Sequence, residues 1–155
     1  MDDHLSNLYE TDALIWTETQ IALLRAGKFD QLDLENIISE LGYQVRKDKN
    51  EVASRLRGLM AHLLKYQFQP GRRSHSWAST IHNHREEIQG VLNQMPSLRP
   101  QLDEYVAHAY PKAVRTAVLD TRMRASDFPR ENPYTTEQIL DFTFFPSENE
   151  KAADP

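Results

Sequence analysis

One arginine shares a helical face with apolar residues, and its charge makes it the first candidate for chemistry. Arg85 lies at helical spacing from its apolar neighbours on this face, which are Trp77, Ile81, Ile88 and Leu92. A guanidinium is rarely buried without a partner, so this position requires an acid beside it. Glu35 and Glu40 border the apolar stripe of another predicted helix and are the candidates. We favour a buried ion pair that fixes the fold. A functional pocket around the pair and an Arg85 that extends into solvent are the alternatives.

A histidine and a lysine lie three residues apart at the edge of a second apolar face. His62 and Lys65 are therefore neighbours on a helix. A nearby cation makes histidine a poor base unless an acid compensates, so a structural role is favoured over a catalytic one. With the previous residues they define a candidate polar cluster for a small-ligand binder or an enzyme: Glu35, Glu40, His62, Lys65 and Arg85.

The sequence gives little support for a metal site, a cofactor site or a known catalytic motif. His82 and His84 are two residues apart and point in different directions on a helix, so they cannot chelate one ion together. The chain has no cysteine, and we find no glycine-rich phosphate loop, nucleophile elbow or paired-carboxylate motif. The sequence predicts no metal site and no cofactor.

Cations and aromatic side chains alternate in the segment before and after Pro70-Gly71. Its candidate surface residues are Arg72, Arg73, His75 and Trp77. Such a mixture can bind phosphate groups or single-stranded nucleic acid. However, the formal net charge of the chain is −5. Residues 52–90 have a net charge of +4, whereas residues 1–51 contain 11 Asp/Glu and only 5 Lys/Arg. We therefore favour a connecting loop that meets an acidic surface over a nucleic-acid interface.

Composition and periodicity predict an all-α fold, a bundle of about five helices that would position these groups. Five glycines among 155 residues and scattered β-branched residues favour helix over strand. A first helix is expected from about Leu8 to Ala26, with Gly27 as its left-handed stop. Asp33 is the expected N-cap of the second helix.

The second helix carries a long apolar stripe in which nearly all steps are three or four residues: Leu34, Ile38, Leu41, Val45, Val52, Leu56, Leu59, Leu63 and Tyr66. The stripe lapses at residues 46–50. An unbroken helix of about 33 residues would be roughly 50 Å long, whereas a compact domain of this size is about 40 Å across. Two possibilities stay open: one long, bent or projecting helix over residues 34–67, or two helices separated at residues 46–50.

The rest of the chain predicts further helices and an irregular end. One helix starts after the Pro70–Ser74 loop, and another follows Pro96, with Pro111 expected to kink or split it. Thr135 to Gln138 form a capping box for a short helix, and Phe142, Phe144 and Phe145 are expected to pack back onto the bundle. We expect a single helical domain over residues 1–147 and a frayed tail over residues 148–155. The acidic start and the absence of a long apolar run predict no signal peptide, no membrane span and a cytoplasmic location.

Several segments together resemble a known bacterial family, called domain of unknown function 29. They include Leu8-Tyr9 with Asp12 and Trp16, residues 33–41, residues 55–67, Pro70 through Ser74 with Trp77, Ile81 with Arg85, Pro96-Ser97-Leu98, and Phe128-Pro129 with residues 132–135. The resemblance implies an all-helical fold and no securely established activity. It marks Glu40, His62, Lys65 and Arg85 as pattern positions.

The leading functional hypothesis is a non-enzymatic protein-interaction or regulatory module, acting with a protein partner or as a homo-oligomer. It depends on the missing catalytic motifs and on the long amphipathic helix, which would expose an apolar patch if it projects. The alternatives are an enzyme or ligand binder that uses the polar cluster and, more weakly, nucleic-acid binding through Arg72 and Arg73.

Overall fold

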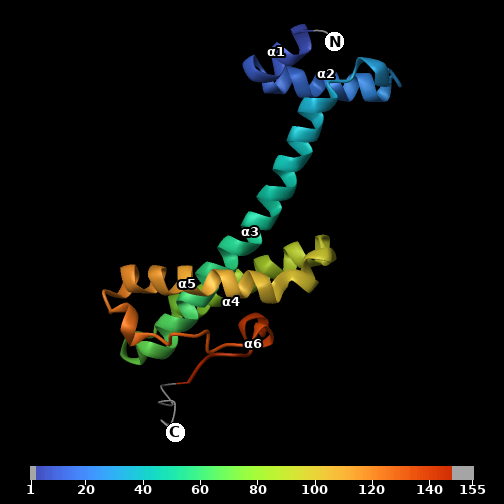
Figure 1. The fold of residues 1–155 in the computed structure, drawn as a ribbon. Coiled ribbons are helices and arrows are strands. Elements are labelled where there is room, and N and C mark those ends of the chain that lie inside the picture. The colour runs from blue at the N-terminus through green and yellow to red at the C-terminus, as the bar shows by residue number, and fades with distance from the viewer. Residues whose placement is uncertain (1–2, 148–155) are drawn as a thin grey trace. The chain divides into compact units, whose positions relative to one another are not determined.

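The computed structural model describes residues 3–147, and the predicted all-α fold is confirmed: the described chain contains six α-helices and no strand (Figure 1). The helices are α1 (Asp3–Thr11), α2 (Ala13–Arg25), α3 (Leu34–Phe68), α4 (His75–Gln94), α5 (Leu102–Thr121) and α6 (Thr136–Leu140). Short 3-10 turns join them at Phe29–Gln31, Pro70–Arg72, Pro96–Gln101 and Ala125–Asp127. No helix within residues 3–147 combines the length and apolar character that crossing a membrane requires.

The chain divides into two compact units. The N-terminal unit extends to Asp48, and the C-terminal unit begins at Lys49. Helix α3 starts in the first unit and ends in the second. The single domain over residues 1–147 stays a prediction, and the tail over residues 148–155 lies outside the described residues.

In the N-terminal unit, α1 and α2 lie against each other and replace the single first helix that we predicted (Figure 1). The division occurs at Asp12, because its carboxylate accepts a hydrogen bond from the Ile15 main-chain N–H at 3.1 Å and so caps a new helix. Gly27 ends this region with φ of 69°, which confirms the predicted left-handed stop.

Helix α3 is continuous through residues 46–50, so the possibility of two separate helices is wrong. The polar segment there is compatible with a helix because it contains no proline and no glycine. In addition, the Gln44 side chain donates to Asp48 at 3.1 Å, a contact one turn apart along the helix.

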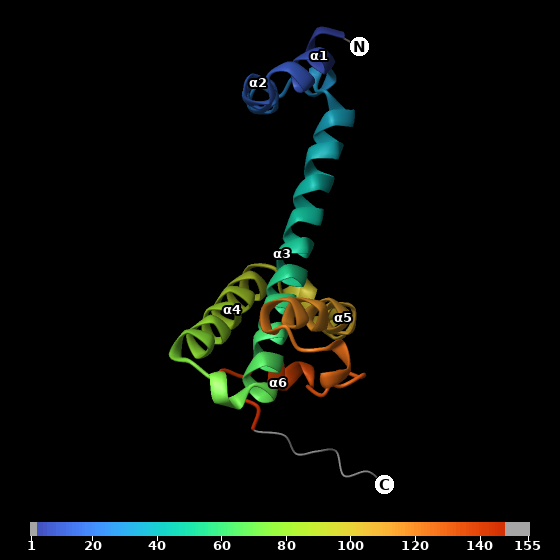
Figure 2. The ribbon, with the colours of Figure 1, turned by 90° about the vertical axis from the view of Figure 1, so that its left-hand side faces the viewer.

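The second half of α3 is the centre of the C-terminal unit and runs between α4 and α5 (Figure 2). Four residues of its predicted apolar stripe are fully buried there, namely Val52, Leu56, Leu59 and Leu63, and Met60 and Leu64 beside them are fully buried as well. Helix α4 contributes Ile81, Ile88 and Leu92, and α5 contributes Val106, Ala109, Tyr110, Ala113 and Ala117. This unit therefore has a hydrophobic core of its own.

Helix α5 is continuous through Pro111, so a split of this helix near residues 107–110 is wrong, while the alternative that Pro111 kinks the helix stays a prediction. Proline removes one main-chain donor, and this leaves the Ala107 carbonyl without its usual partner. The buried residues Ala109, Tyr110 and Ala113 lie on both sides of Pro111. Their packing against the core holds the helix together across the proline.

The C-terminal segment packs onto this core. The predicted capping box is present, since Thr135 Oγ1 accepts from the Gln138 N–H at 3.1 Å and Gln138 Oε1 accepts from the Thr135 N–H at 3.0 Å. Ile139 is fully buried and Phe144 packs against the core. Phe142 and Phe145 are more than one-third exposed, but their ring centres each lie 5.3 Å from an aromatic ring of the bundle, that of His82 and that of Tyr66 respectively. The predicted return of the three phenylalanines onto the bundle is therefore confirmed.

Candidate functional site

Arg85 is completely buried, as its place on the apolar face of α4 predicts. Its Nε donates to the Ile139 carbonyl at 2.8 Å, and its Nη2 donates to the Gln138 carbonyl at 3.3 Å. The guanidinium also lies 5.5 Å from the centre of the Phe145 ring. Burial lowers the pKa of Arg85, and the nearby Asp141 opposes this shift. The predicted ion pair with Glu35 or Glu40 is wrong for the described residues, because main-chain carbonyls of α6 are the acceptors.

Lys65 is the second buried cation of the C-terminal unit. Its ammonium group is 3.1 Å from Asp120 Oδ2 on α5 and 5.4 Å from the centre of the Trp77 ring on α4. Only 6% of the residue is exposed, whereas the Asp120 side chain is 45% exposed. Lys65 therefore links α3 to both neighbouring helices through contacts that are already made within the protein.

His62 and His84 face each other across a close approach of α3 and α4. Their ring centres are 6.1 Å apart, and His62 Nδ1 is 2.9 Å from the Gly58 carbonyl oxygen, to which it donates when it carries a proton. A Cβ atom at Gly58 would lie 2.8 Å from His84 Nε2, so this position requires glycine unless the ring moves. Burial lowers the pKa of both imidazoles, and the cations Lys65 and Arg55 lower them further.

This histidine pair predicts a loss of stability in mild acid. The folded chain binds protons at His62 and His84 less readily than the unfolded chain, so the free energy of unfolding should fall as the pH drops below about 6.5. Denaturant titrations across this range measure the slope. We expect His62→Gln with His84→Gln to flatten it, and an unchanged slope in that variant would contradict the assignment.

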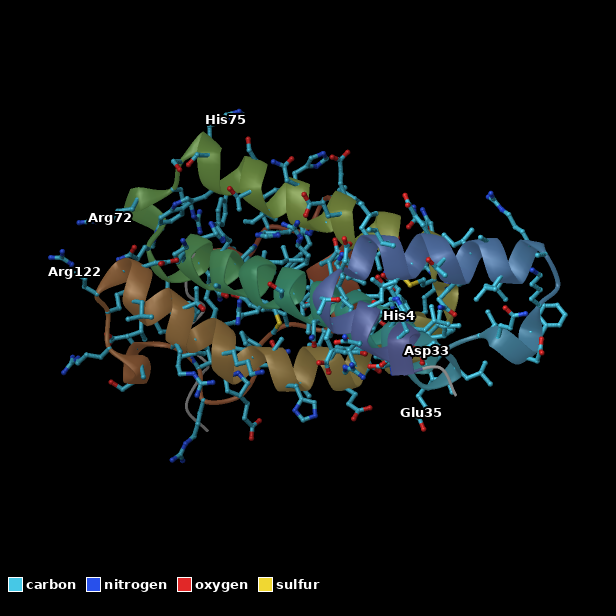
Figure 3. The ribbon with its side chains drawn as sticks, turned by 90° about the horizontal axis from the view of Figure 1, so that it is seen from above. His4, Asp33, Glu35, Arg72, His75 and Arg122 are labelled. Carbon is cyan, nitrogen blue, oxygen red and sulfur yellow. The ribbon has the colours of Figure 1, made fainter. Side chains whose placement is uncertain are left out.

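The two glutamates of the candidate cluster lie in the N-terminal unit, whereas His62, Lys65 and Arg85 lie in the C-terminal unit. Glu40 accepts a hydrogen bond from the Tyr9 hydroxyl at 2.7 Å. Glu35 is exposed at the start of α3 and points away from the helix (Figure 3). The five residues therefore belong to two different units, and a functional role for any of them stays a prediction.

The polar core of the N-terminal unit depends on Asp33, which caps α3. Its carboxylate accepts from the Trp16 indole at 3.0 Å and from the Asn36 side chain at 2.7 Å, while its main-chain N–H donates to Gln20 at 2.9 Å. Burial raises the pKa of Asp33, but the hydrogen bonds from Asn36 and Trp16 outweigh burial and lower it overall. This network fixes α2 on the start of α3.

The predicted basic and aromatic surface is not one surface. Arg73 donates to the Tyr66 carbonyl at 2.7 Å and to the Pro146 carbonyl at 3.3 Å, and it stacks 4.3 Å from the centre of the Tyr66 ring. Arg72 and His75 are exposed and point outward (Figure 3). Trp77 is half-buried beside Lys65. Arg73 therefore holds the C-terminal segment and does not present its charge to a ligand.

Large apolar side chains of the N-terminal unit are exposed, and the sequence raised this possibility only for a projecting second helix. Helix α3 exposes Leu34, Ile38, Leu41 and Val45 by 58%, 68%, 64% and 53%. The same unit also exposes Leu14, Ile15, Ile21, Leu24, Phe29 and Tyr43. In contrast, its buried residues among those described are Trp16 and Gln20 alone. The N-terminal unit thus presents most of its large apolar side chains to solvent.

Two hollows in the C-terminal unit contain residues that the sequence did not single out. The larger, about 580 Å³, lies beside α5 and includes Tyr110, Phe128 and Arg130. The other, about 240 Å³, lies between α3 and α5 and includes Arg57, His108 and Lys112. The described residues contain no group of three or more His, Cys, Asp or Glu side chains that could hold a metal ion. The helical periodicity did not single out Arg57, His108 and Lys112, because these polar residues lie beside the apolar stripes of α3 and α5.

Comparison with known proteins identifies the family but adds no relative of known function. No curated protein and no solved structure matches the chain. The family model described as "Domain of unknown function DUF29" matches residues 8–145, which is nearly the whole chain and includes both compact units. The chain therefore belongs to the family of domain of unknown function DUF29.

Proposed function

We propose that this chain is a protein-interaction module of a bacterial cytoplasm, and that its N-terminal unit associates with a second copy of the chain. The observation that carries the proposal is the exposure of Leu34, Ile38, Leu41 and Val45 on one helix. Exposed apolar side chains that gather on one element are typical of a protein interface. In the proposed dimer, the N-terminal unit of the second copy covers these four side chains, which no apolar surface covers within the described part of their own unit.

The small core of the N-terminal unit is a second reason to expect a partner. This unit ends at Asp48, and a unit of about this length buries a smaller share of its surface than a larger domain does, so its own core supplies little stability. Its described interior consists of Trp16, Gln20 and the polar network around Asp33. Burial of the exposed stripe would supply hydrophobic free energy that the unit does not gain by itself.

The spacing of the stripe favours a second copy as the partner. The steps from Leu34 to Ile38, Leu41 and Val45 are four, three and four residues, the spacing of heptad core positions. This order is the same in both directions along the helix. Two antiparallel copies therefore place Leu34 opposite Val45 of the partner and Ile38 opposite Leu41 of the partner. A two-fold axis between residues 39 and 40 generates all four pairs.

Charge makes this association dependent on salt. Residues 1–48 contain 10 Asp/Glu and 4 Lys/Arg, so two N-terminal units repel each other at long range. Dissolved salt screens this repulsion and leaves apolar burial intact. Salt should therefore strengthen the proposed dimer, whereas it would weaken the binding of a basic partner.

Spin-label distances test the antiparallel arrangement. The chain has no cysteine, so Ser39→Cys or Lys47→Cys gives one labelling site per copy. Residue 47 lies far from the expected axis, and its two labels should be separated by about 22 Å along the helix direction, at 1.5 Å per residue. The two labels at residue 39 should be nearly level and much closer together.

Pulsed dipolar spectroscopy distinguishes the possible outcomes. A longer distance for residue 47 than for residue 39 supports the antiparallel pair. Equal distances would indicate a parallel pair and contradict the proposed arrangement. The absence of any dipolar coupling between copies would mean that the chain does not associate through this face.

A further inference from the structure

The hollow between α3 and α5 carries a positive charge in a chain that is negative overall. Its lining consists of Asn50, Ala53, Ser54, Arg57, Tyr105, His108, Ala109 and Lys112. Two of these residues, Arg57 and Lys112, are basic, one is a histidine and none is an acid. The chain as a whole has a formal net charge of −5. The local charge of this hollow therefore favours an anion.

Helical spacing explains how the polar groups come to surround the hollow. On α3, Asn50, Ser54 and Arg57 follow one another at steps of four and three residues. On α5, Tyr105, His108 and Lys112 do the same at steps of three and four. Side chains at this spacing share one face of a helix, so each helix contributes one polar wall. Ala53 and Ala109 are short and leave space between the walls.

The polar side chains of this hollow are not engaged elsewhere in the described structure. None of the side chains of Arg57, His108 and Lys112 makes a hydrogen bond or ion pair within residues 3–147, and the same holds for Asn50, Ser54 and Tyr105. Arg55, two residues before Arg57, is paired with Glu87 at 2.6 Å and does not line the hollow. The donors of the hollow are thus available to a ligand.

We propose that this hollow is a binding site for a phosphate group, either inorganic phosphate or a small phosphomonoester. Arg57 and Lys112 match the charge of a phosphate dianion and approach it from opposite walls. Ser54, Tyr105 and Asn50 provide further donors for its remaining oxygens. The volume of about 240 Å³ is below that of typical drug-sized sites, so the ligand is small.

Inorganic phosphate is the probe that tests this site. A titration followed by amide chemical shifts at constant ionic strength should move the signals of residues 50–57 and 105–112. Arg57→Gln with Lys112→Gln should weaken phosphate binding at least about tenfold, because two charge-assisted contacts are lost. Both residues are exposed, and circular dichroism will show that the variant keeps its helices.

A matched control and a competing anion complete the experiment. Arg72→Gln with Arg122→Gln removes the same charge from exposed positions outside the hollow and should leave phosphate binding unchanged. The proposal is overturned if phosphate moves no signals in the two segments, or if the control weakens binding as much as the test variant. Malonate that binds as tightly as phosphate would overturn the phosphate assignment. The site lies within the C-terminal unit, so its test does not depend on dimerisation.

Discussion

Arg85→Ala should lower the free energy of unfolding by about 3–5 kcal/mol. The substitution removes a fully buried side chain and leaves a cavity between α4 and α6. It also leaves the carbonyls of Ile139 and Gln138 without their donor in a buried environment. The free-energy costs of the unsatisfied carbonyls and of the cavity add to each other. This variant should therefore be among the least stable single-residue variants of the chain.

Urea unfolding measures the global effect, and amide hydrogen exchange locates it. Exchange should accelerate most in residues 136–141, because Arg85 holds this segment against α4. Arg115→Ala is the matched control, since it removes an exposed arginine from α5 and should change stability by less than about 0.5 kcal/mol. If Arg85→Ala had an effect as small as that of the control, the guanidinium would not be a structural link.

Local patterns predicted much of the fold. The left-handed stop at Gly27 and the capping box at Thr135 depend on residues adjacent in sequence, and both are confirmed. The burial of Arg85 followed from its helical position and is also confirmed. The division of the first helix at Asp12 was missed, because one carboxylate caps a new helix within an otherwise continuous helical pattern.

The partners of the polar residues could not be predicted in the same way. Periodicity shows which face of a helix Arg85 occupies but not which segment covers it, and the covering carbonyls lie more than 50 residues later. The sequence also suggested that Glu40 and Arg85 share a site, yet each has its partner within its own unit. Similarly, the apolar stripe of α3 gives no sign that its first half is exposed and its second half buried.

The second large effect is expected at the exposed half of that stripe. Ile38→Gln with Leu41→Gln removes two apolar side chains from each copy and should weaken association at least about a hundredfold. Both side chains are about two-thirds exposed at 68% and 64%, so the fold of the single chain should not depend on them. Glutamine is neutral and favours helix, which means that a loss of association cannot result from added charge or a broken helix.

Leu119→Gln is the matched control for this pair. Leu119 is 81% exposed and lies on α5 in the C-terminal unit, outside the proposed interface. Its replacement removes an exposed leucine without changing the stripe of α3. We expect this variant to associate as the unaltered chain does.

Sedimentation equilibrium of the unaltered chain and these variants tests most directly whether the N-terminal unit binds a second copy. The monomer mass is 18.0 kDa. The unaltered chain and Leu119→Gln should approach twice this mass as concentration rises, at lower concentrations when salt is added, while the Ile38→Gln and Leu41→Gln double variant should stay at the monomer mass. A monomer at every concentration and salt level, or a double variant that dimerises as well as the unaltered chain, would contradict the proposed self-association.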